Sequence, residues 1–535
     1  MKAKFFSIVT IALALFCTTA SAQFKINTGK NSPLQKLQWA EVAINSLYVD
    51  SVNEDKLAED AIRGMLEKLD PHSTYSTAEE VRELNEPLQG NFDGIGVQFN
   101  MVEDTLMIIQ TINDGPSEKV GILAGDRIVS VNDTAIAGVK MDKNKIMKML
   151  RGPKGTKVRV GIVRRGIEGT LDFTITRDKI PVKTIDAYYM IRPGVGYIRI
   201  GSFGATTYKE FLEALMDMSQ TKDGKHKLLK DQFKTIIIDL QDNGGGYLNT
   251  AVNLAEMFLN KGDLIVYTEG RAQKRQDFTA STTGDLSKTK VIVLVNEYSA
   301  SASEILSGAI QDHDRGTIIG RRTFGKGLVQ RPIPLPDESM IRLTVAHYYT
   351  PSGRCIQKPY TKGDKKAYEK DLLDRYNNGE FTNADSIHFN DSLKYYTLNK
   401  HRVVYGGGGI MPDIFVPLDT MQYTKYHRAL SAKSIILNAN LKYIDRERKN
   451  LVSEYKDFDD FNARFEIPDE VIEGIYAEGE KQKITPKDDA EKAQTTARLK
   501  VQLKALVARD IWTMTEYFRI MNEENDIVQA ALKAK

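Results

Sequence analysis

The chain has little cysteine and almost no net charge, and both shortages exclude classes of protein. Only two of its 535 residues are cysteine, so a framework of several disulfides is excluded. Its 74 basic and 71 acidic residues leave a formal charge of +3, and no basic stripe points to a nucleic-acid partner. With 41% hydrophobic and 27% charged residues, it is neither collagen-like nor disordered. Its length predicts about three or four domains.

Long apolar runs are also missing. The run at the N-terminus, Phe5–Phe16, has twelve residues, whereas a membrane helix needs about 20. It follows Lys2 and Lys4 and precedes Ala20–Ala22, which completes the pattern of a secretory signal peptide. We expect cleavage after Ala22 and export to the periplasm or another extracytoplasmic compartment. An uncleaved N-terminal anchor is the alternative.

Cleavage would change the counts that matter for folding outside the cell. It would remove Cys17 and two lysines, leaving a charge of +1 and one cysteine, Cys355. No intramolecular disulfide is then expected. Cys355 has no histidine near it in sequence, so we interpret it as structural.

Changes in residue pattern divide the chain into five segments. Helical periodicity gives way to short β-like runs with glycines, then to strands alternating with helices, and finally to a charged helical segment. The predicted boundaries are 1–22 (signal peptide), 30–88 (helical), 89–180 (β-rich), 181–420 (α/β, with a polar insertion at 360–402) and 421–535 (helical). The expected fold class is therefore α/β (α+β) and multidomain.

Two turns that follow buried strands gather unusual residues. The apolar run Thr235–Ile238 leads into Asp239–Gly246, which ends in three glycines, and Val291–Val295 leads into Ser299–Glu304. Glycines let the backbone approach a ligand and can aim N–H groups at it. A tight strand-to-helix turn is the alternative explanation of the glycines.

The serine run has two interpretations. Ser301 and Glu304 fit a capping box that starts the following helix. The same place puts a hydroxyl at the positive end of a helix, beside a backbone N–H suited to an oxyanion. The residues alone leave both open.

A serine nucleophile needs a base, and none of the seven histidines stands in a recognisable pattern. The sequence has no Gly-x-Ser-x-Gly elbow and no His-Glu-x-x-His zinc motif. His313 follows the serine helix but lies among polar residues, as a solvated histidine would. Lys326 remains, because burial that lowers a lysine pKa from about 10.4 towards about 7–8 makes the amine a base.

The segment around Lys326 also nearly matches a phosphate-binding P-loop. Gly320, Gly325 and Lys326 have the right spacing. Gly327, however, replaces the magnesium-binding hydroxyl residue, and a strand-like run follows where the motif requires a helix. Nucleotide binding is therefore not expected.

Nine short motifs occur in a fixed order along the chain: Leu69–Ser73, Gly94–Val97, Gly121–Ile128, Gly201–Phe203, Asp239–Gly246, Ser299–Glu304, Thr323–Gly327 with Gln330, Tyr348–Arg354 and Gly409–Asp413. Taken in this order, they resemble the C-terminal processing (tail-specific) serine peptidase family. The resemblance covers about residues 35–420 and rests on the ordered set, since each motif alone is weak. It implies a PDZ-like module before a crotonase/ClpP-like α/β peptidase core.

The resemblance also implies a Ser–Lys dyad that needs no metal or organic cofactor. Ser301 would be the nucleophile and Lys326 its general base. Gln330 matches the position that orients the lysine amine. The family's oxyanion hole corresponds to the N–H groups of Ala302 and Gly245.

The glycine loop departs from the family pattern at two positions. Gln241 stands where arginine is usual, and Gly244 stands where proline is usual. These changes leave open which glycine donates to the oxyanion, but they do not touch the dyad.

The PDZ-like module would select the substrate. By resemblance, Gly94, Ile95, Gly96 and Val97 capture the terminal carboxylate of an extended peptide. Their amides suit an anion, and the two apolar side chains suit a hydrophobic terminal residue. We therefore expect an exported serine endopeptidase that acts on proteins with an exposed apolar C-terminus.

The alternative function is a catalytically silent PDZ-type binding protein or chaperone that keeps the fold. The joint presence of Ser301, Lys326 and Gln330 favours the peptidase. An adaptor protein and a homodimer stay open as partners, whereas nucleic acid is not expected. For residues 421–535, dimerisation, covering of the core and docking of a partner all fit amphipathic helices.

Overall fold

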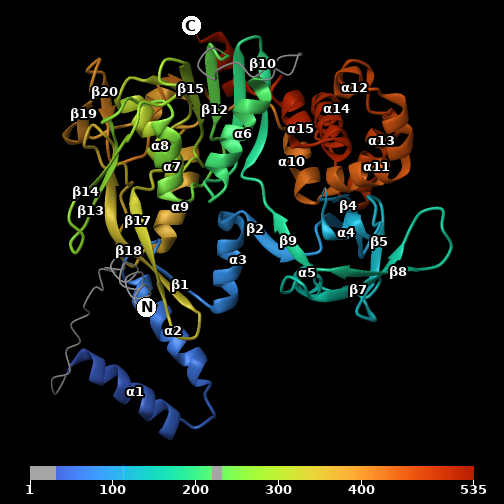
Figure 1. The fold of residues 1–535 in the computed structure, drawn as a ribbon, viewed down its shortest axis with the longest axis horizontal. Helices are drawn as coiled ribbons and strands as arrows, with labels where there is room; N and C mark the ends of the chain where they lie inside the picture. The colour runs from blue at the N-terminus through green and yellow to red at the C-terminus, as the bar shows by residue number, and fades with distance from the viewer. Residues whose placement is uncertain (1–31, 113, 220–231, 535) are drawn as a thin grey trace, which may run out of the picture. The chain divides into compact units, whose positions relative to one another are not determined.

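The computed structural model describes residues 32–112, 114–219 and 232–534 (Figure 1). The predicted signal peptide and its cleavage site lie outside the described residues. The chain forms two compact units, residues 1–65 and 66–535. Among the helices described, none combines the length and the apolar character needed to cross a bilayer.

The first unit contains α1 (Pro33–Leu47) and most of α2 (Glu54–Glu67). The Ser32 hydroxyl accepts the N–H of Gln35 and so caps α1, and Pro33 fills the first helical position, which needs no N–H partner. None of the side chains of α1 is buried. Helix α2 starts with two acidic residues, which favour a helix N-terminus.

The β-rich segment forms a module with its own core. Its elements are β2 (Asn91–Gly94), β3 (Val97–Val102), β4 (Thr105–Thr111), α4 (Pro116–Lys119), β5 (Arg127–Val131), β6 (Thr134–Ala135), α5 (Lys143–Leu150), β7 (Lys157–Val163), β8 (Leu171–Thr176) and β9 (Asp178–Pro181). The sheet order is β3-β4-β5-β7-β8, with β6 on β5, while β2 pairs with β9. Within the described strands β3 pairs only with β4, so it is an edge strand.

The α/β segment is built on a six-stranded sheet of order β10-β11-β12-β15-β16-β21. Its elements are β10 (Ile185–Arg192), β11 (Val195–Ile200), α6 (Thr207–Ser219), β12 (Thr235–Asp239), α7 (Leu248–Glu256), β15 (Lys290–Val295), α8 (Ala302–Asp312), β16 (Gly316–Gly320) and β21 (Ile414–Phe415). Only the β10–β11 pair is antiparallel. The two apolar runs identified in the sequence are the central strands β12 and β15, as expected for parallel strands buried on both faces. The predicted mixed α/β class is confirmed.

A second, smaller sheet joins strands of this segment to β1 of the N-terminal segment. It has the order β1-β18-β13-β14, with β17 on β18. The remaining elements of this part are β1 (Thr74–Ser76), α3 (Ala78–Gln89), β13 (Leu264–Glu269), β14 (Gln276–Thr279), β17 (Leu328–Pro334), β18 (Met340–Tyr349), α9 (Lys365–Asn377), η2 (Ala384–Ser386), η3 (Asp391–Leu393), β19 (Lys394–Tyr396) and β20 (Val403–Tyr405). Strand β1 lies in a stretch expected to be helical. It pairs with β18, a partner far away in sequence.

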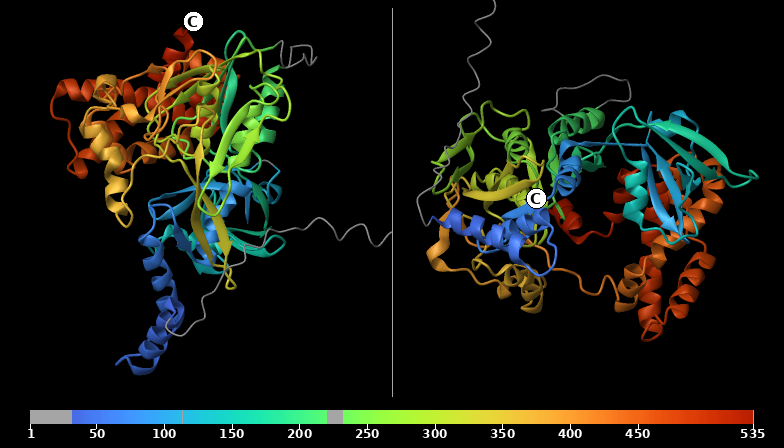
Figure 2. Two further views of the ribbon diagram at one scale, coloured as in Figure 1. Left: turned by 90° about the vertical axis from the view of Figure 1, so that its left-hand side faces the viewer. Right: turned by 90° about the horizontal axis from the view of Figure 1, so that it is seen from below.

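The C-terminal segment is helical throughout its described residues and has a core of its own. Its helices are α10 (Lys425–Ala432), α11 (Ile435–Glu454), α12 (Phe458–Arg464), α13 (Asp469–Lys481), α14 (Asp489–Ile511), α15 (Met514–Met521) and α16 (Asp526–Lys533). Helix α11 contacts the PDZ-like module, and Figure 2 shows the C-terminal helices beside the strands of that module. Arg127 pairs with Asp445 at 2.9 Å, and Arg448 donates to the Ile109 carbonyl at 3.1 Å.

The last helix completes the α/β core. Ile236 and Ile238 of β12 pack in the apolar layer that contains α6, α7 and α8. Ile237, which points to the other face, packs with Ile527 and Val528 of α16. A parallel sheet needs cover on both faces. Of the three roles left open for residues 421–535, covering the core is therefore the one that α16 performs.

Candidate active site

Ser301 stands at the N-terminus of α8 in a backbone conformation that a simple cap does not need. Its φ is 57° and its ψ is −112°, whereas a helix cap normally has an extended conformation. A positive φ is strained for a residue with a Cβ, and such strain costs about 1–3 kcal/mol and concentrates at functional sites. The side chain is half-buried. Capping of α8 alone therefore does not explain the backbone conformation of Ser301.

Glu304 joins the serine turn to the lysine turn. Its Oε2 accepts the N–H of Ser301 and the N–H of Lys326, both at 2.8 Å. Its Oε1 accepts the N–H of Gly325 at 2.7 Å and the hydroxyl of Thr323. The side chain is fully buried, and this burial raises the pKa of Glu304 to about 7 against the opposing effect of its four donors. One carboxyl group thus holds the two candidate catalytic residues next to each other.

Tyr348 of β18 holds the same two residues through their carbonyl groups. Its hydroxyl lies 3.0 Å from the Ser301 carbonyl oxygen and also contacts the carbonyl oxygen of Lys326. The ring is buried, with 1% of its surface exposed. Because a hydroxyl has one proton, the two carbonyls share it.

The Lys326 side chain is placed where its charge is disfavoured. Burial lowers the pKa of Lys326, and the nearby positive charge of Arg342 lowers it further, while Glu304 and Asp70 act in the opposite direction. Among the described residues, no hydrogen bond or ion pair engages the Lys326 amine. An amine without a counterion in a desolvated place is suited to act as a base.

The Leu69–Ser73 motif lies beside this lysine. Burial, and secondly the charge of Lys326, lowers the pKa of His72 to about 4, so its ring is neutral at pH 7. His72 Nε2 lies 2.9 Å from the Tyr368 hydroxyl. The neutral ring adds no second positive charge next to the lysine.

Gln330 is near this region, but its amide has another partner. Gln330 Nε2 donates to Thr344 Oγ1 at 3.3 Å, and Thr344 in turn donates to Asp70 at 2.8 Å. No contact in the described part of the chain joins the Gln330 amide to Lys326. Its orienting role therefore stays a prediction.

The glycine loop packs directly against Ser301. A Cβ added at Gly245 would come within 2.8 Å of the Ser301 Cβ and 2.9 Å of the Ala302 nitrogen, and the φ of Gly245 is +100°. Only glycine fits there. Its own N–H, however, donates to Asn243 Oδ1 at 2.8 Å.

Other backbone N–H groups of these two turns have no acceptor among the described residues. They belong to Ala302, the first residue of α8, and to the exposed loop residues Gly244 and Gly246. A helix N-terminus carries partial positive charge. Ala302 therefore lies next to the loop, as predicted. The N–H of Gly245, the other predicted donor, is already bonded to Asn243 within the loop.

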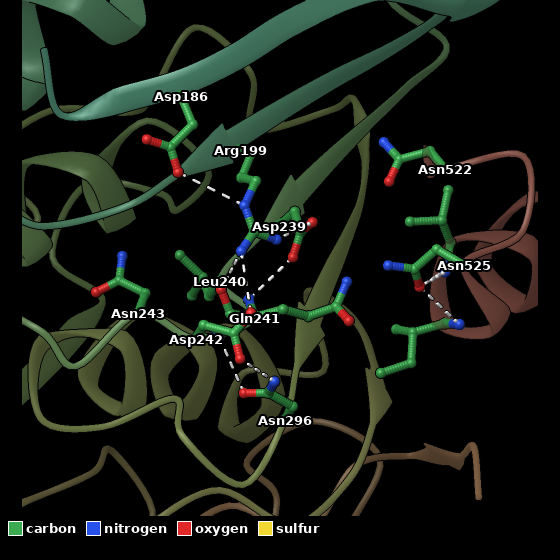
Figure 3. Close-up of polar contacts among 12 residues, drawn as sticks. Asp186, Arg199, Asp239, Leu240, Gln241, Asp242, Asn243, Asn296, Asn522 and Asn525 are labelled. Atoms are coloured by element: carbon green, nitrogen blue, oxygen red, sulfur yellow. Dashed lines mark hydrogen bonds and ion pairs between the residues drawn. The ribbon is translucent and has the colours of Figure 1, made fainter. Parts of the chain in front are cut away.

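The Arg199 side chain of β11 also holds the loop through hydrogen bonds and ion pairs (Figure 3). The guanidinium bonds Asp239 at 2.9 Å, the Gln241 carbonyl at 2.9 Å and Asp242 at 3.2 Å. Asp242 is held further by Asn296, which accepts its N–H at 3.0 Å and donates to its carboxylate at 2.8 Å. No sequence signal had singled out Arg199.

The predicted carboxylate-binding loop lies between β2 and β3. Ile95 is 4% exposed and belongs to the core of the module, so its side chain does not face a ligand. Its carbonyl is held by the Ser117 N–H and hydroxyl at 3.1 and 2.6 Å. Within the described structure the N–H groups of Ile95 and Gly96 have no acceptor. Val97 starts the edge strand β3.

Cys355 has a neighbour that the sequence did not reveal. Its Sγ lies 3.8 Å from His347 Nδ1, because Cys355 follows a turn that returns to the end of β18. Burial raises the pKa of the Cys355 thiol. A protonated thiol is a weak nucleophile, in keeping with a structural residue. Among the described residues, no three His, Cys, Asp or Glu side chains are grouped to hold a metal ion.

Four family models match successive parts of the chain. They are the activating protease CtpB N-terminal domain over residues 16–80, the PDZ domain over 94–175, peptidase family S41 over 194–367, and a family of unknown function (DUF8443) over 426–513.

Similar curated proteins span most of the chain. The carboxy-terminal-processing protease of Bartonella bacilliformis is 36% identical over 77% of this chain and 92% of its own length. The carboxy-terminal processing protease CtpA of Bacillus subtilis is 36% identical over 68% of this chain and 75% of its own length.

Solved structures also match. The photosystem II D1 C-terminal processing protease is 25% identical over 72% of this chain and 88% of its own, with a TM-score of 0.34. The PDZ domain of the carboxy-terminal protease from Vibrio cholerae, solved in complex with a peptide, is 28% identical over 17% of this chain and 97% of its own, with a TM-score of 0.16.

Proposed function

Since the chain belongs to the carboxy-terminal-processing proteases of peptidase family S41 and carries a PDZ domain, we propose that it cleaves with Ser301 as nucleophile and Lys326 as general base. The observation that carries the proposal is the shared carboxylate of Glu304. It receives the backbone N–H groups of both residues on one oxygen. The strained backbone of Ser301 and the uncompensated amine of Lys326 support the same assignment.

The reaction follows from these roles. The neutral Lys326 amine takes the proton of the Ser301 hydroxyl, and Oγ attacks the carbonyl carbon of the scissile peptide. The lysine then gives this proton to the leaving amine nitrogen, and the acyl-enzyme remains. Water attacks the acyl carbon, Lys326 takes its proton, and the proton returns to Ser301 Oγ as the acid leaves.

The tetrahedral intermediates carry a negative oxygen that needs donors already in place. The Ala302 N–H, at the positive end of α8, is the first. A glycine of the loop is the second. Gly245 would have to exchange its Asn243 acceptor for the oxyanion, whereas the Gly244 N–H is exposed and without an acceptor in the described structure. Loss of one such donor typically costs about 10²–10³ in kcat.

The PDZ domain is proposed to bind the substrate's C-terminus. The unpaired edge of β3 can accept an extended peptide as an added strand, and the N–H groups of Ile95 and Gly96 can take its terminal carboxylate. Phe99 of β3 and Lys143 of α5 lie together, with the amine 5.5 Å from the ring centroid. Because Ile95 is a core residue, Val97 and Phe99 are the apolar side chains left to meet the peptide.

We further propose that the protein is exported and that its substrates are exported proteins with apolar C-termini. The support is the signal-peptide pattern of residues 1–22. Edman or mass-spectrometric sequencing of the mature N-terminus tests this, and the expected first residue is Gln23. A mature chain that still begins at Met1 would contradict it.

The cleavage test compares the wild type with Ser301→Ala and Lys326→Ala on an unfolded protein that ends in an apolar tail. We expect the rate to fall by at least about 10³ in both variants. Ser453→Ala and Lys500→Ala, at exposed positions of α11 and α14, are the matched controls and should cleave like the wild type. Equal cleavage by all five proteins would contradict the dyad. A wild type that binds the tail but never cleaves would favour the alternative, a silent PDZ-type binding protein.

A further inference from the structure

The helical C-terminal segment contacts Arg199, the side chain of β11 that holds the active-site loop. The Phe518 ring of α15 lies 4.6 Å from the guanidinium carbon of Arg199, measured to the ring centroid. Arg199 is 9% exposed, so this cation–π contact is largely desolvated. A second contact follows on the same helix end, where Asn522 donates to the Tyr189 hydroxyl at 3.0 Å.

Arg199 has three acceptors at the end of β12 and in the loop that follows it. They are the Asp239 carboxylate, the Gln241 carbonyl and the Asp242 carboxylate (Figure 3). Asp239 also accepts the hydroxyl of Tyr197 and the N–H of Gln241. The planar guanidinium can engage several acceptors in fixed directions, which a lysine cannot do.

Asn243 connects the residues held by Arg199 to the serine turn. The next residue, Asn243, accepts through its carbonyl the N–H of Ala300 at 3.0 Å and the hydroxyl of Ser303 at 2.9 Å, on both sides of Ser301. Its side chain accepts the N–H of Gly245 at 2.8 Å. The place of Asn243 therefore sets the distance between the glycine loop and the serine.

The Gln241 side chain adds no anchor of its own to the loop. Its amide nitrogen is buried and has no hydrogen-bond partner among the described residues. The side chain lines a cavity of about 200 Å³ together with Arg199, Phe518 and Asn522. This leaves Arg199, which comes from β11, as the cation that holds the loop.

We propose that Phe518 and Arg199 are positioning residues for the oxyanion loop, which makes the C-terminal helical segment a working part of the peptidase. Phe518 limits the guanidinium to one plane, and the guanidinium fixes residues 239–242. Those residues place Asn243 and the glycines against Ser301. The inference rests on the proposed function, because it assigns the loop to the oxyanion of that reaction.

The test measures kcat and KM separately for the full-length mature protein, with a peptide substrate that ends in an apolar residue. Phe518→Ala should lower kcat about tenfold and change KM less than about twofold, since a desolvated cation–π contact is worth about that factor. Arg199→Lys should lower kcat at least as much, because lysine keeps the charge but lacks the planar guanidinium with its several fixed donors. Phe518→Tyr keeps the ring face and should restore kcat to within about twofold of the wild type.

Tyr455→Ala is the matched control. Tyr455 is another tail aromatic beneath an arginine, 5.0 Å from Arg464, but it lies in the core of the tail and has no contact with the loop. It should lose stability without losing kcat. A thermal unfolding scan of each variant identifies any that fails to fold. If Phe518→Ala fails to fold, Phe518→Leu, which keeps apolar volume without a ring face, takes its place.

The outcomes separate this inference from the proposed function. Normal kcat in folded Phe518→Ala or Phe518→Leu, or equal loss of kcat in Tyr455→Ala, overturns the positioning role while the dyad stands. A loss confined to KM also overturns it. If the wild type does not cleave, or if Ser301→Ala cleaves like the wild type, the proposed function fails first.

Discussion

The carboxyl group of Glu304 should make the stability of the core depend on pH with a defined sign. Burial raises its pKa in the folded chain from 4.5 to about 7. Between those pH values the folded chain keeps a proton that the unfolded chain has released. Stability is therefore lost as pH rises through this range. The difference of about 2.5 pH units corresponds to about 3 kcal/mol.

Glu304→Gln removes this titration at almost constant volume. We expect the wild type to lose about 3 kcal/mol of unfolding free energy relative to Glu304→Gln between about pH 4.5 and 7. Above and below this window the two curves should run parallel. Urea unfolding followed by circular dichroism from pH 4 to 8 measures the difference, in which the other titrating groups cancel. Glu473→Gln, at an exposed position of α13, is the control and should track the wild type throughout.

A rise in relative stability with pH would contradict a raised pKa of Glu304. The four donors to Glu304 stabilise its ionised form, and burial destabilises it. If the wild type gained stability relative to Glu304→Gln as pH rose, the donors would outweigh burial. A constant difference would show that Glu304 does not titrate in this range.

Three further predictions concern Lys326, the PDZ domain and helix α16. Arg342→Gln removes a charge that lowers the pKa of Lys326, so the pH profile of kcat/KM should shift to higher pH. Arg331→Gln, at an exposed position of β17, is the control and should leave the profile in place. Identical profiles of the wild type and Arg342→Gln would exclude the electrostatic effect. Amidation of the substrate's C-terminus should slow cleavage at least about tenfold, and an unchanged rate would contradict carboxylate capture by the PDZ domain. Val528→Asp places a charge against the sheet and should destabilise the core by more than about 3 kcal/mol. Val452→Asp changes a side chain that is 57% exposed on α11 and should not destabilise the core. Equal unfolding midpoints of the two variants would show that α16 does not cover the sheet.

The parts of the fold that depend on local pattern could be predicted. Strands β12 and β15 were found because a parallel strand buried on both faces is a continuous apolar run. Ser301 and Lys326 were selected because each follows such a strand or lies between glycines in an ordered set of motifs. The structure then places their backbones on the same carboxylate.

Contacts between distant segments could not be predicted from these patterns. The sequence predicts Glu304 as a helix cap, and Glu304 does cap α8 by accepting the Ser301 N–H. Its bond to the Lys326 N–H could not be predicted, because it exists only after the two turns meet. Phe518 and Arg199 have no local signal, because each looks like an ordinary helix or strand residue. Ile95 was assigned to the peptide site on its apolar character, which is equally the character of a core residue.

Covalent labelling of the serine gives the sharpest test of the Ser301–Lys326 dyad. A phosphonofluoridate that reacts with activated serine hydroxyls is added at neutral pH, and the modified residue is found by peptide mapping. We expect one label per chain, on Ser301, and labelling at least about 10²-fold slower in Lys326→Ala because its general base is gone. A label on Ser299 or Ser303, or an undiminished rate in Lys326→Ala, would contradict the Ser301–Lys326 dyad.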